Sequence, residues 1–133
     1  VGNDPAKEPW LDETIATYCE SLYFERYHPE HLAWWWSNRV DGFKPEGWVN
    51  ATIYIPGGYS AYRDAVYLNG AKFMQELRNL TGDDAFFAAL QQYTLQNTYK
   101  IASESDFFKA LRNHSSADLN PLLQKYFENP PAY

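Results

Sequence analysis

The residue types best suited to metal binding are thinly spread along this sequence. His28 and His31 are three residues apart, a spacing that would place both side chains on one face of a helix. Pro29 lies between them and would disrupt the helix that such an arrangement needs. The sequence contains no His-Glu-x-x-His segment, and His114 is distant from the other two histidines along the chain. The pattern therefore favours surface histidines over a metal centre built from them.

Glu13 is a second candidate for a functional residue, and it lies in the segment that the sequence predicts to be the first helix. Pro9 suits the first position of a helix because its φ is fixed and it has no N–H to satisfy. Two residues along a helix correspond to about 200° of rotation, so Glu13 lies opposite the apolar stripe. Periodicity alone therefore predicts a solvated glutamate, and it makes Cys19 a small buried residue. The stripe consists of Leu11, Ile15, Tyr18, Cys19 and Leu22.

Tyr67 and Tyr62 are the third candidates, because a phenol can donate a hydrogen bond while it stays neutral. Tyr67 borders the apolar side of a predicted helix. The sequence holds eleven tyrosines, so this position taken alone indicates an amphipathic core residue.

The elements that must position these residues are helices joined by short turns. Gly82 followed by Asp83 is a helix stop and a new start, with Gly as C′ and Asp as N-cap. Ser103 or Ser105 caps a later helix, and Asp118 caps the last one. We predict an all-α fold in one helical domain over residues 1–133. The expected helices start near Pro9 and then cover residues 30–40, 62–80, 84–99 and 119–127, with a further helix that begins at Ser103 or Ser105 and carries Phe107, Phe108 and Leu111. A loop is expected over 41–60, with a short extended piece at 51–55.

Composition narrows the classes of function. Hydrophobic residues make up 45% and aromatic residues 18% of the 133 residues, which is too apolar for a disordered chain. The formal charge of −6 argues against nucleic acid as a partner, since nucleic-acid binding needs clustered Lys and Arg. No apolar run approaches the roughly 20 residues of a membrane span. Trp34, Trp35 and Trp36 point in three helical directions, so they cannot all lie in one small core.

Two separated segments resemble gluzincin zinc metallopeptidases of the aminopeptidase N type. The first is Trp10-Leu11-Asp12-Glu13, which is similar to the segment that carries the third zinc ligand in that family. The second is Tyr-Arg-Asp-Ala-Val-Tyr-Leu-Asn-Gly-Ala at residues 62–71, which is similar to the stretch that contains the family's catalytic tyrosine. The resemblance implies the C-terminal, helical half of a thermolysin-like catalytic domain.

The resemblance also implies roles for three residues. Glu13 corresponds to the glutamate ligand of zinc, and Tyr67 to the tyrosine that stabilises the oxyanion formed when activated water attacks a peptide carbonyl. Tyr62 matches a second family tyrosine five residues earlier. The sequence departs from the family at Thr14, where Gly is usual, and at Asn69, where Lys is usual.

Counting back from Glu13 by the family's spacing passes Val1, so we expect the histidine ligands and the general base to lie outside this sequence. The parent protein would then be a zinc peptidase acting on peptides, and the isolated 133 residues would be inactive and hold no zinc tightly. We also expect self-association through the apolar face left by the missing half. A non-enzymatic helical interaction module is the alternative that the aromatic content leaves open.

Overall fold

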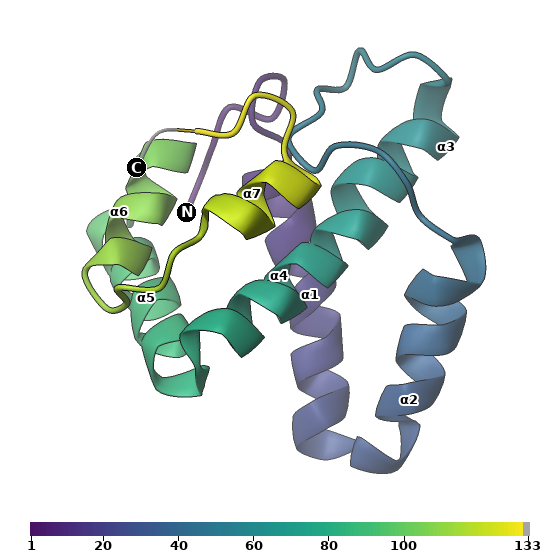
Figure 1. Ribbon diagram of the computed structural model, residues 1–133, viewed down its shortest axis with the longest axis horizontal. Coiled ribbons are helices and arrows are strands. Elements are labelled where there is room, and N and C mark those ends of the chain that lie inside the picture. Colours follow the sequence, from purple (N-terminus) through teal and green to yellow (C-terminus); the bar gives the residue numbers. More distant parts are fainter. Residues whose placement is uncertain (132–133) are drawn as a thin grey trace.

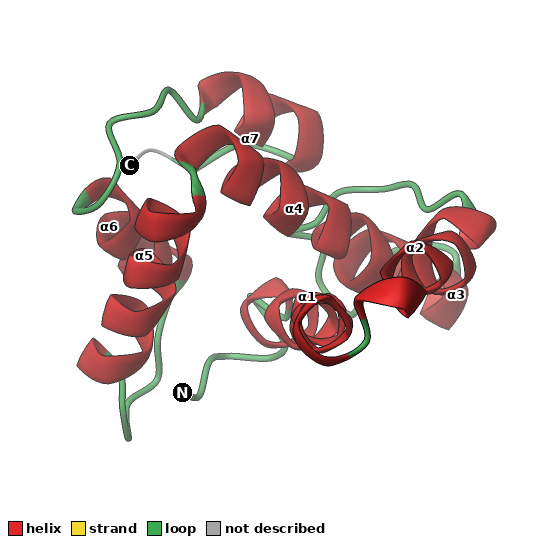
Figure 2. Cartoon of the chain, turned by 90° about the horizontal axis from the view of Figure 1, so that it is seen from below, coloured by secondary structure: helices red, strands yellow, loops and turns green. Residues whose placement is uncertain are grey.

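The computed structural model describes residues 1–131, and every regular element in that range is helical (Figure 2). A single isolated bridge pairs Gly2 with Ile101, and no strand forms in the described range. The all-α prediction is confirmed. The elements are α1 (Trp10–Tyr27), η1 (Pro29–His31), α2 (Leu32–Trp35), η2 (Trp36–Val40), η3 (Asp41–Phe43), α3 (Gly58–Tyr62), η4 (Arg63–Asn69), α4 (Gly70–Thr81), α5 (Asp83–Gln96), α6 (Glu104–Arg112) and α7 (Asn120–Tyr126).

The fold is built on α1 and α4, which are in contact and cross one another at an angle (Figure 1). The segment that contains α2 lies on one side of α1, and α5, α6 and α7 lie towards the other (Figure 1). Trp10, at the first position of α1, is buried at the centre of an aromatic core. Its indole contacts the rings of Phe73, Phe107, Phe108 and Phe127, with centroid distances of 5.2–6.0 Å.

α1 buries Leu11 and Tyr18 of the predicted apolar stripe and partly buries Ile15 and Leu22, but its buried face also includes small hydroxyl residues. Thr14, Thr17 and Ser21 are almost completely buried, and each hydroxyl donates a hydrogen bond to a backbone carbonyl. Small hydroxyl residues allow close approach of a neighbouring helix without leaving an unpaired polar group. The prediction that Cys19 is buried is wrong: it is a free, exposed cysteine, because the buried face of α1 is rotated away from it.

The predicted helix over residues 62–80 is also more complex. It begins as α3, widens into the π-helix η4 with i→i+5 hydrogen bonding, and returns to α geometry in α4. The predicted extended piece at 51–55 is wrong, because those residues form turns and irregular backbone. Hydrophobic alternation in so short a piece does not distinguish a strand from a loop whose side chains reach the core.

Other local signals are confirmed in part. Gly82 ends α4 with a positive φ of 81°, as predicted. The predicted N-caps Asp83 and Asp118 are wrong, because Gly82 and Leu119 hold those positions and neither helix start has a side-chain cap. Ser103 caps α6 in a capping box with Asp106, in which each side chain accepts from the other residue's backbone N–H. The tryptophans of the Trp-Trp-Trp run do not share one environment: Trp35 is buried, Trp36 half-buried and Trp34 exposed.

Candidate active site

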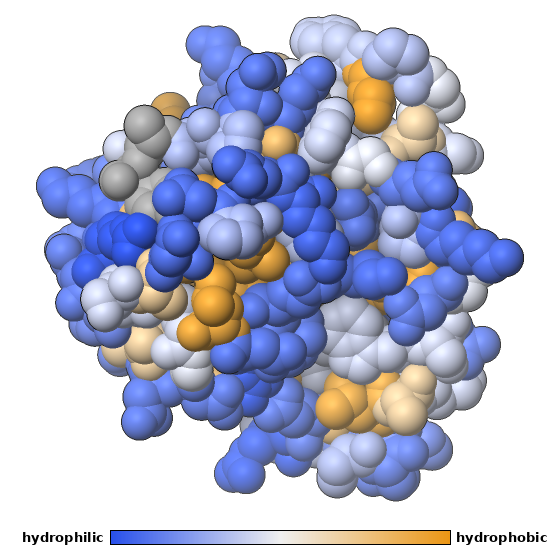
Figure 3. Space-filling view, viewed as in Figure 1, coloured by the Kyte–Doolittle hydropathy of each residue, from blue (hydrophilic) through white to orange (hydrophobic). Residues whose placement is uncertain are grey.

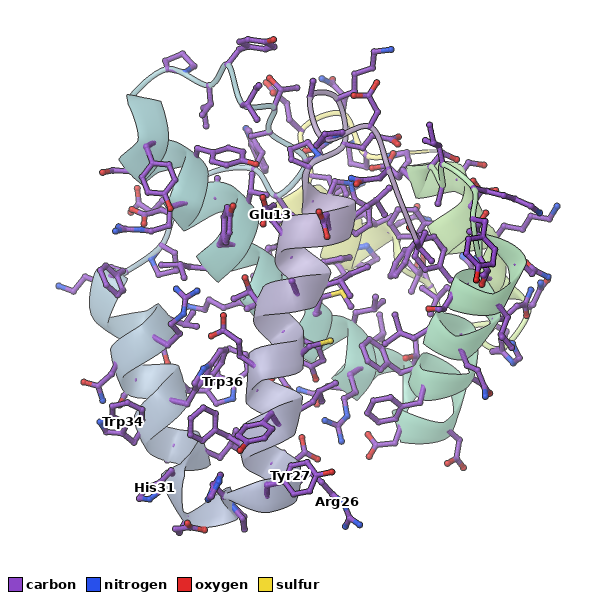
Figure 4. The ribbon with its side chains drawn as sticks, turned by 180° about the vertical axis from the view of Figure 1, so that it is seen from behind. Glu13, Arg26, Tyr27, His31, Trp34 and Trp36 are labelled. Atoms are coloured by element: carbon purple, nitrogen blue, oxygen red, sulfur yellow. The ribbon has the colours of Figure 1, made fainter. Side chains whose placement is uncertain are left out.

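Glu13 lies in the first turn of α1 and faces the segment that carries the two candidate tyrosines (Figure 4). Its side chain is half-buried, so the periodicity-based expectation of a fully solvated glutamate is wrong. No basic side chain among residues 1–131 forms an ion pair with it. Its charge is therefore not neutralised by a neighbouring cation in the described part of the chain.

The π-helix brings Tyr62 and Tyr67 into contact. Their ring centroids are 5.7 Å apart and their planes make an angle of 79°, an edge-to-face arrangement. In an α-helix, residues five apart point about 140° away from each other, because each residue turns the chain by about 100°. The i→i+5 register of η4 removes most of that divergence. Both phenols are close enough to Glu13 for its charge to act on them.

The electrostatics of this group keep the phenols protonated. Burial raises the pKa of Tyr67 above its ordinary value of 10, and a hydrogen-bonding interaction with Glu13 and the charge of Glu13 raise this pKa further. Burial also raises the pKa of Tyr62, with smaller contributions from the charges of Glu13 and Asp12. A neutral phenol at physiological pH is a hydrogen-bond donor, which is the state that stabilisation of a developing oxyanion requires.

Contacts around η4 hold it against α1 and against the preceding loop. The Thr14 hydroxyl donates to the carbonyl of Val66, directly before Tyr67. Gly70 faces Thr14 so closely that a Cβ on Gly70 would collide with the Thr14 side chain. On the loop side, the Asn69 amide donates to the carbonyl of Gly47 at 2.8 Å. The sequence gives no signal for these contacts, because each joins residues that lie far apart along the chain.

The donor set for a metal is incomplete within the described residues. No three His, Cys, Asp or Glu side chains in that range come together as a metal-binding group. His28 and His31 are exposed beyond the far end of α1, where both face Glu30, and His28 lies about 20 Å along the helix from Glu13 at 1.5 Å per residue. The residues present therefore fit one carboxylate ligand of a zinc ion, with a phenol donor beside it.

A separate cavity of about 350 Å³ lies between the N-terminal segment, α1 and α5. Its walls are mainly apolar, and Glu13, Tyr62 and Tyr67 are not among its lining residues. They include Leu11, Ile15, Ala16, Cys19, Leu90 and Tyr93.

Comparison with known proteins identifies the class. Residues 1–126 match the peptidase family M1 domain. The chain belongs to peptidase family M1.

Two curated relatives are both named aminopeptidase N. The protein from Lactobacillus helveticus is 23% identical and that from Lactobacillus delbrueckii subsp. lactis 22% identical, each over 134 residues. Each alignment covers 91% of this chain and 16% of the relative, so the chain spans about a sixth of the length of these relatives. No solved structure matches the chain. The family resemblance inferred from the two segments is confirmed.

Proposed function

We propose that this segment forms part of the active site of a zinc-dependent aminopeptidase, in which Glu13 is a zinc ligand and Tyr67 stabilises the oxyanion. The observation that carries the proposal is the approach of the Glu13 carboxylate to the Tyr67 phenol, from helices that lie far apart in the sequence. The match to family M1 and the names of the two relatives support it.

The roles follow from the chemistry of each group. When bound, zinc would act as a Lewis acid that activates water for attack on the peptide carbonyl. The Glu13 carboxylate would supply one oxygen ligand, and Tyr67 would donate its O–H to the substrate oxygen as negative charge develops there. Tyr62, in edge-to-face contact with Tyr67, would limit the rotation of that ring.

The remaining parts of such a site would come from elsewhere in the parent protein. Two histidine ligands and a general base are needed, and the 133 residues contain no His-Glu-x-x-His segment. We therefore expect the isolated chain to bind zinc weakly and to hydrolyse no peptide. The substrate of the parent would be a peptide.

The experiment that tests the proposal is a pair of substitutions in the complete parent protein. Glu13→Gln keeps the size of the side chain and removes its charge, so bound zinc, measured by atomic absorption after dialysis, should fall together with peptide hydrolysis. Asp12→Asn is the matched control, since Asp12 is the neighbouring carboxylate of the same helical turn and is exposed. Equal zinc content in Glu13→Gln and the unaltered protein would remove Glu13 from the metal site.

We also propose that the isolated chain self-associates through apolar surface. The cavity beside α1 has apolar walls, and Tyr23, Tyr27 and Trp34 are more than half exposed near the junction of α1 and α2. Figure 4 shows Tyr27 and Trp34 at that end of the molecule, and Figure 3 shows further apolar patches within a mostly hydrophilic surface.

Among the described residues, no helix combines the length and apolar character that crossing a membrane would require.

A further inference from the structure

Thr14 connects the helix that carries Glu13 to the helix that carries Tyr67. Its side chain is completely buried, and its hydroxyl donates to the carbonyl of Val66, 52 residues further along the chain. Val66 directly precedes Tyr67 and lies inside η4. A carbonyl oxygen can accept two hydrogen bonds, so this bond can form without removing one from the helix.

Gly70 makes this close contact possible. A side chain at position 70 would overlap Thr14, so the absence of a Cβ on Gly70 lets α1 and the start of α4 approach. The position of η4 along α1 is thereby fixed at two adjacent points: a hydrogen bond at Val66 and steric contact at Gly70.

The π register is the feature that needs such support. A π-helix is rare and appears mostly as a short segment inside an α-helix. If η4 relaxed to α geometry, Tyr62 and Tyr67 would diverge by about 140°, and both could not remain beside Glu13. A contact from α1 to the centre of η4 opposes that change.

We propose that Thr14 is a positioning residue, which holds η4 in the register that places Tyr67 and Tyr62 beside Glu13. The expected effect of Thr14 on catalysis rests on the proposed function. Its effect on the geometry of η4 does not, and it can be tested in the 133-residue chain alone. Thr14 touches neither substrate nor metal in this proposal, and it acts through the backbone of Val66.

The first test is structural and uses the full chain. Thr14→Val keeps the shape of the side chain and removes the hydroxyl, so the nuclear Overhauser effect between the Tyr62 and Tyr67 rings should be lost. Amide hydrogen exchange in residues 63–71 should become faster. Thr14→Ser should retain both the ring-to-ring Overhauser effect and the slow amide exchange. If valine packs poorly at this position, Thr14→Ala is a second variant that lacks the hydroxyl.

Thr17→Val is the matched control, because Thr17 is also buried in α1 but its hydroxyl bonds to the Glu13 carbonyl within the same helix. This control should keep the contact between the two rings. The proposal is overturned if the Thr14→Val and Thr14→Ala chains both fold and both keep the contact between the Tyr62 and Tyr67 rings. A loss of stability in these variants would not change that conclusion.

The second test uses peptide hydrolysis by the complete parent protein. With Thr14→Val, turnover should fall by up to about 10²-fold, since a small displacement of a catalytic group has that effect, while zinc content stays the same. Loss of the ring contact without a change in turnover would support the positioning of η4 by Thr14 and contradict the proposed role of Tyr67. Unchanged ring contact with reduced turnover would contradict the role of Thr14.

Discussion

At the scale of single residues, Tyr67 combines two properties, and Tyr126 has both of them as well. Its ring packs against the main core cluster, and its phenol approaches a carboxylate on another helix. Tyr126 offers a comparison, because its phenol donates to Glu76 at 2.6 Å and its pKa is raised mainly by burial. Glu76 is also held by Lys125 at 2.7 Å, whereas no such cation pairs with Glu13 within residues 1–131.

Tyr67→Phe is the substitution that isolates the phenol. In the complete parent, turnover should fall by about 10²–10³-fold, the usual effect of removing one donor to an oxyanion. Zinc content should not change, because the phenol is not a ligand in the proposed site. Tyr99→Phe is the control, since Tyr99 is fully exposed. Steady-state kinetics with a peptide substrate would measure both, and equal turnover in the two variants would exclude Tyr67 from the mechanism.

The sequence allows the site residues to be named but not placed. Glu13 and Tyr67 follow from two short segments that resemble the family. Their proximity does not follow, because it depends on how α1 crosses η4 and on the π register. The contact between Thr14 and Val66 is equally inaccessible, since hydroxyl groups carry no periodic signal that would distinguish a buried position from an exposed one.

At the scale of helices, the boundaries that the sequence predicts are set by local signals. Gly82 and Ser103 act through the backbone of their own helix ends, so the residue type alone predicts the boundary. The face buried by α1 depends instead on its neighbour. The apolar periodicity says nothing about Thr14, although its contact with Gly70 is where α4 lies close to α1.

Arg78 joins three helices and gives the fold a testable pH dependence. From α4 it binds Glu25 of α1 at 2.7 Å and Asp83 of α5 at 2.8 Å, and its guanidinium lies 4.9 Å from the Phe87 ring centroid. Hydrogen bonds from Arg78 lower the pKa of both carboxyl groups. Their stabilisation is therefore present above the unfolded pKa values, about 4.3 for Glu and 3.9 for Asp, and is lost as the pH falls through the lower folded values.

The prediction is that the melting temperature of the chain falls steeply below about pH 4, and falls less steeply in Arg78→Met, which is also less stable at pH 7. Arg26→Met is the control, because Arg26 is exposed in the last turn of α1. Circular dichroism melts between neutral and acid pH would measure the slopes. Parallel curves for Arg78→Met and the unaltered chain would contradict this account.

At the scale of the whole molecule, the apolar surface predicts concentration-dependent association. Light scattering of the 133-residue chain at several concentrations should give an apparent mass that rises above 15.5 kDa. Ile15→Glu places a charge in the wall of the cavity beside α1 and should reduce that rise. Ala88→Glu, on α5 outside this cavity, is the control. A constant mass of one chain across the concentrations would reject self-association.

Trp10, at the centre of the aromatic core, and Glu13, in the candidate site, both lie in the first turn of α1. The centre of the core and Glu13 are three residues apart, so only about 4.5 Å of helical rise separates them. A substitution that changes the volume around Trp10 would tilt α1 at its first turn and move the carboxylate with it. Substitutions in this core that adapt the protein to a new temperature would therefore also move Glu13. Stability and the proposed activity are expected to change together.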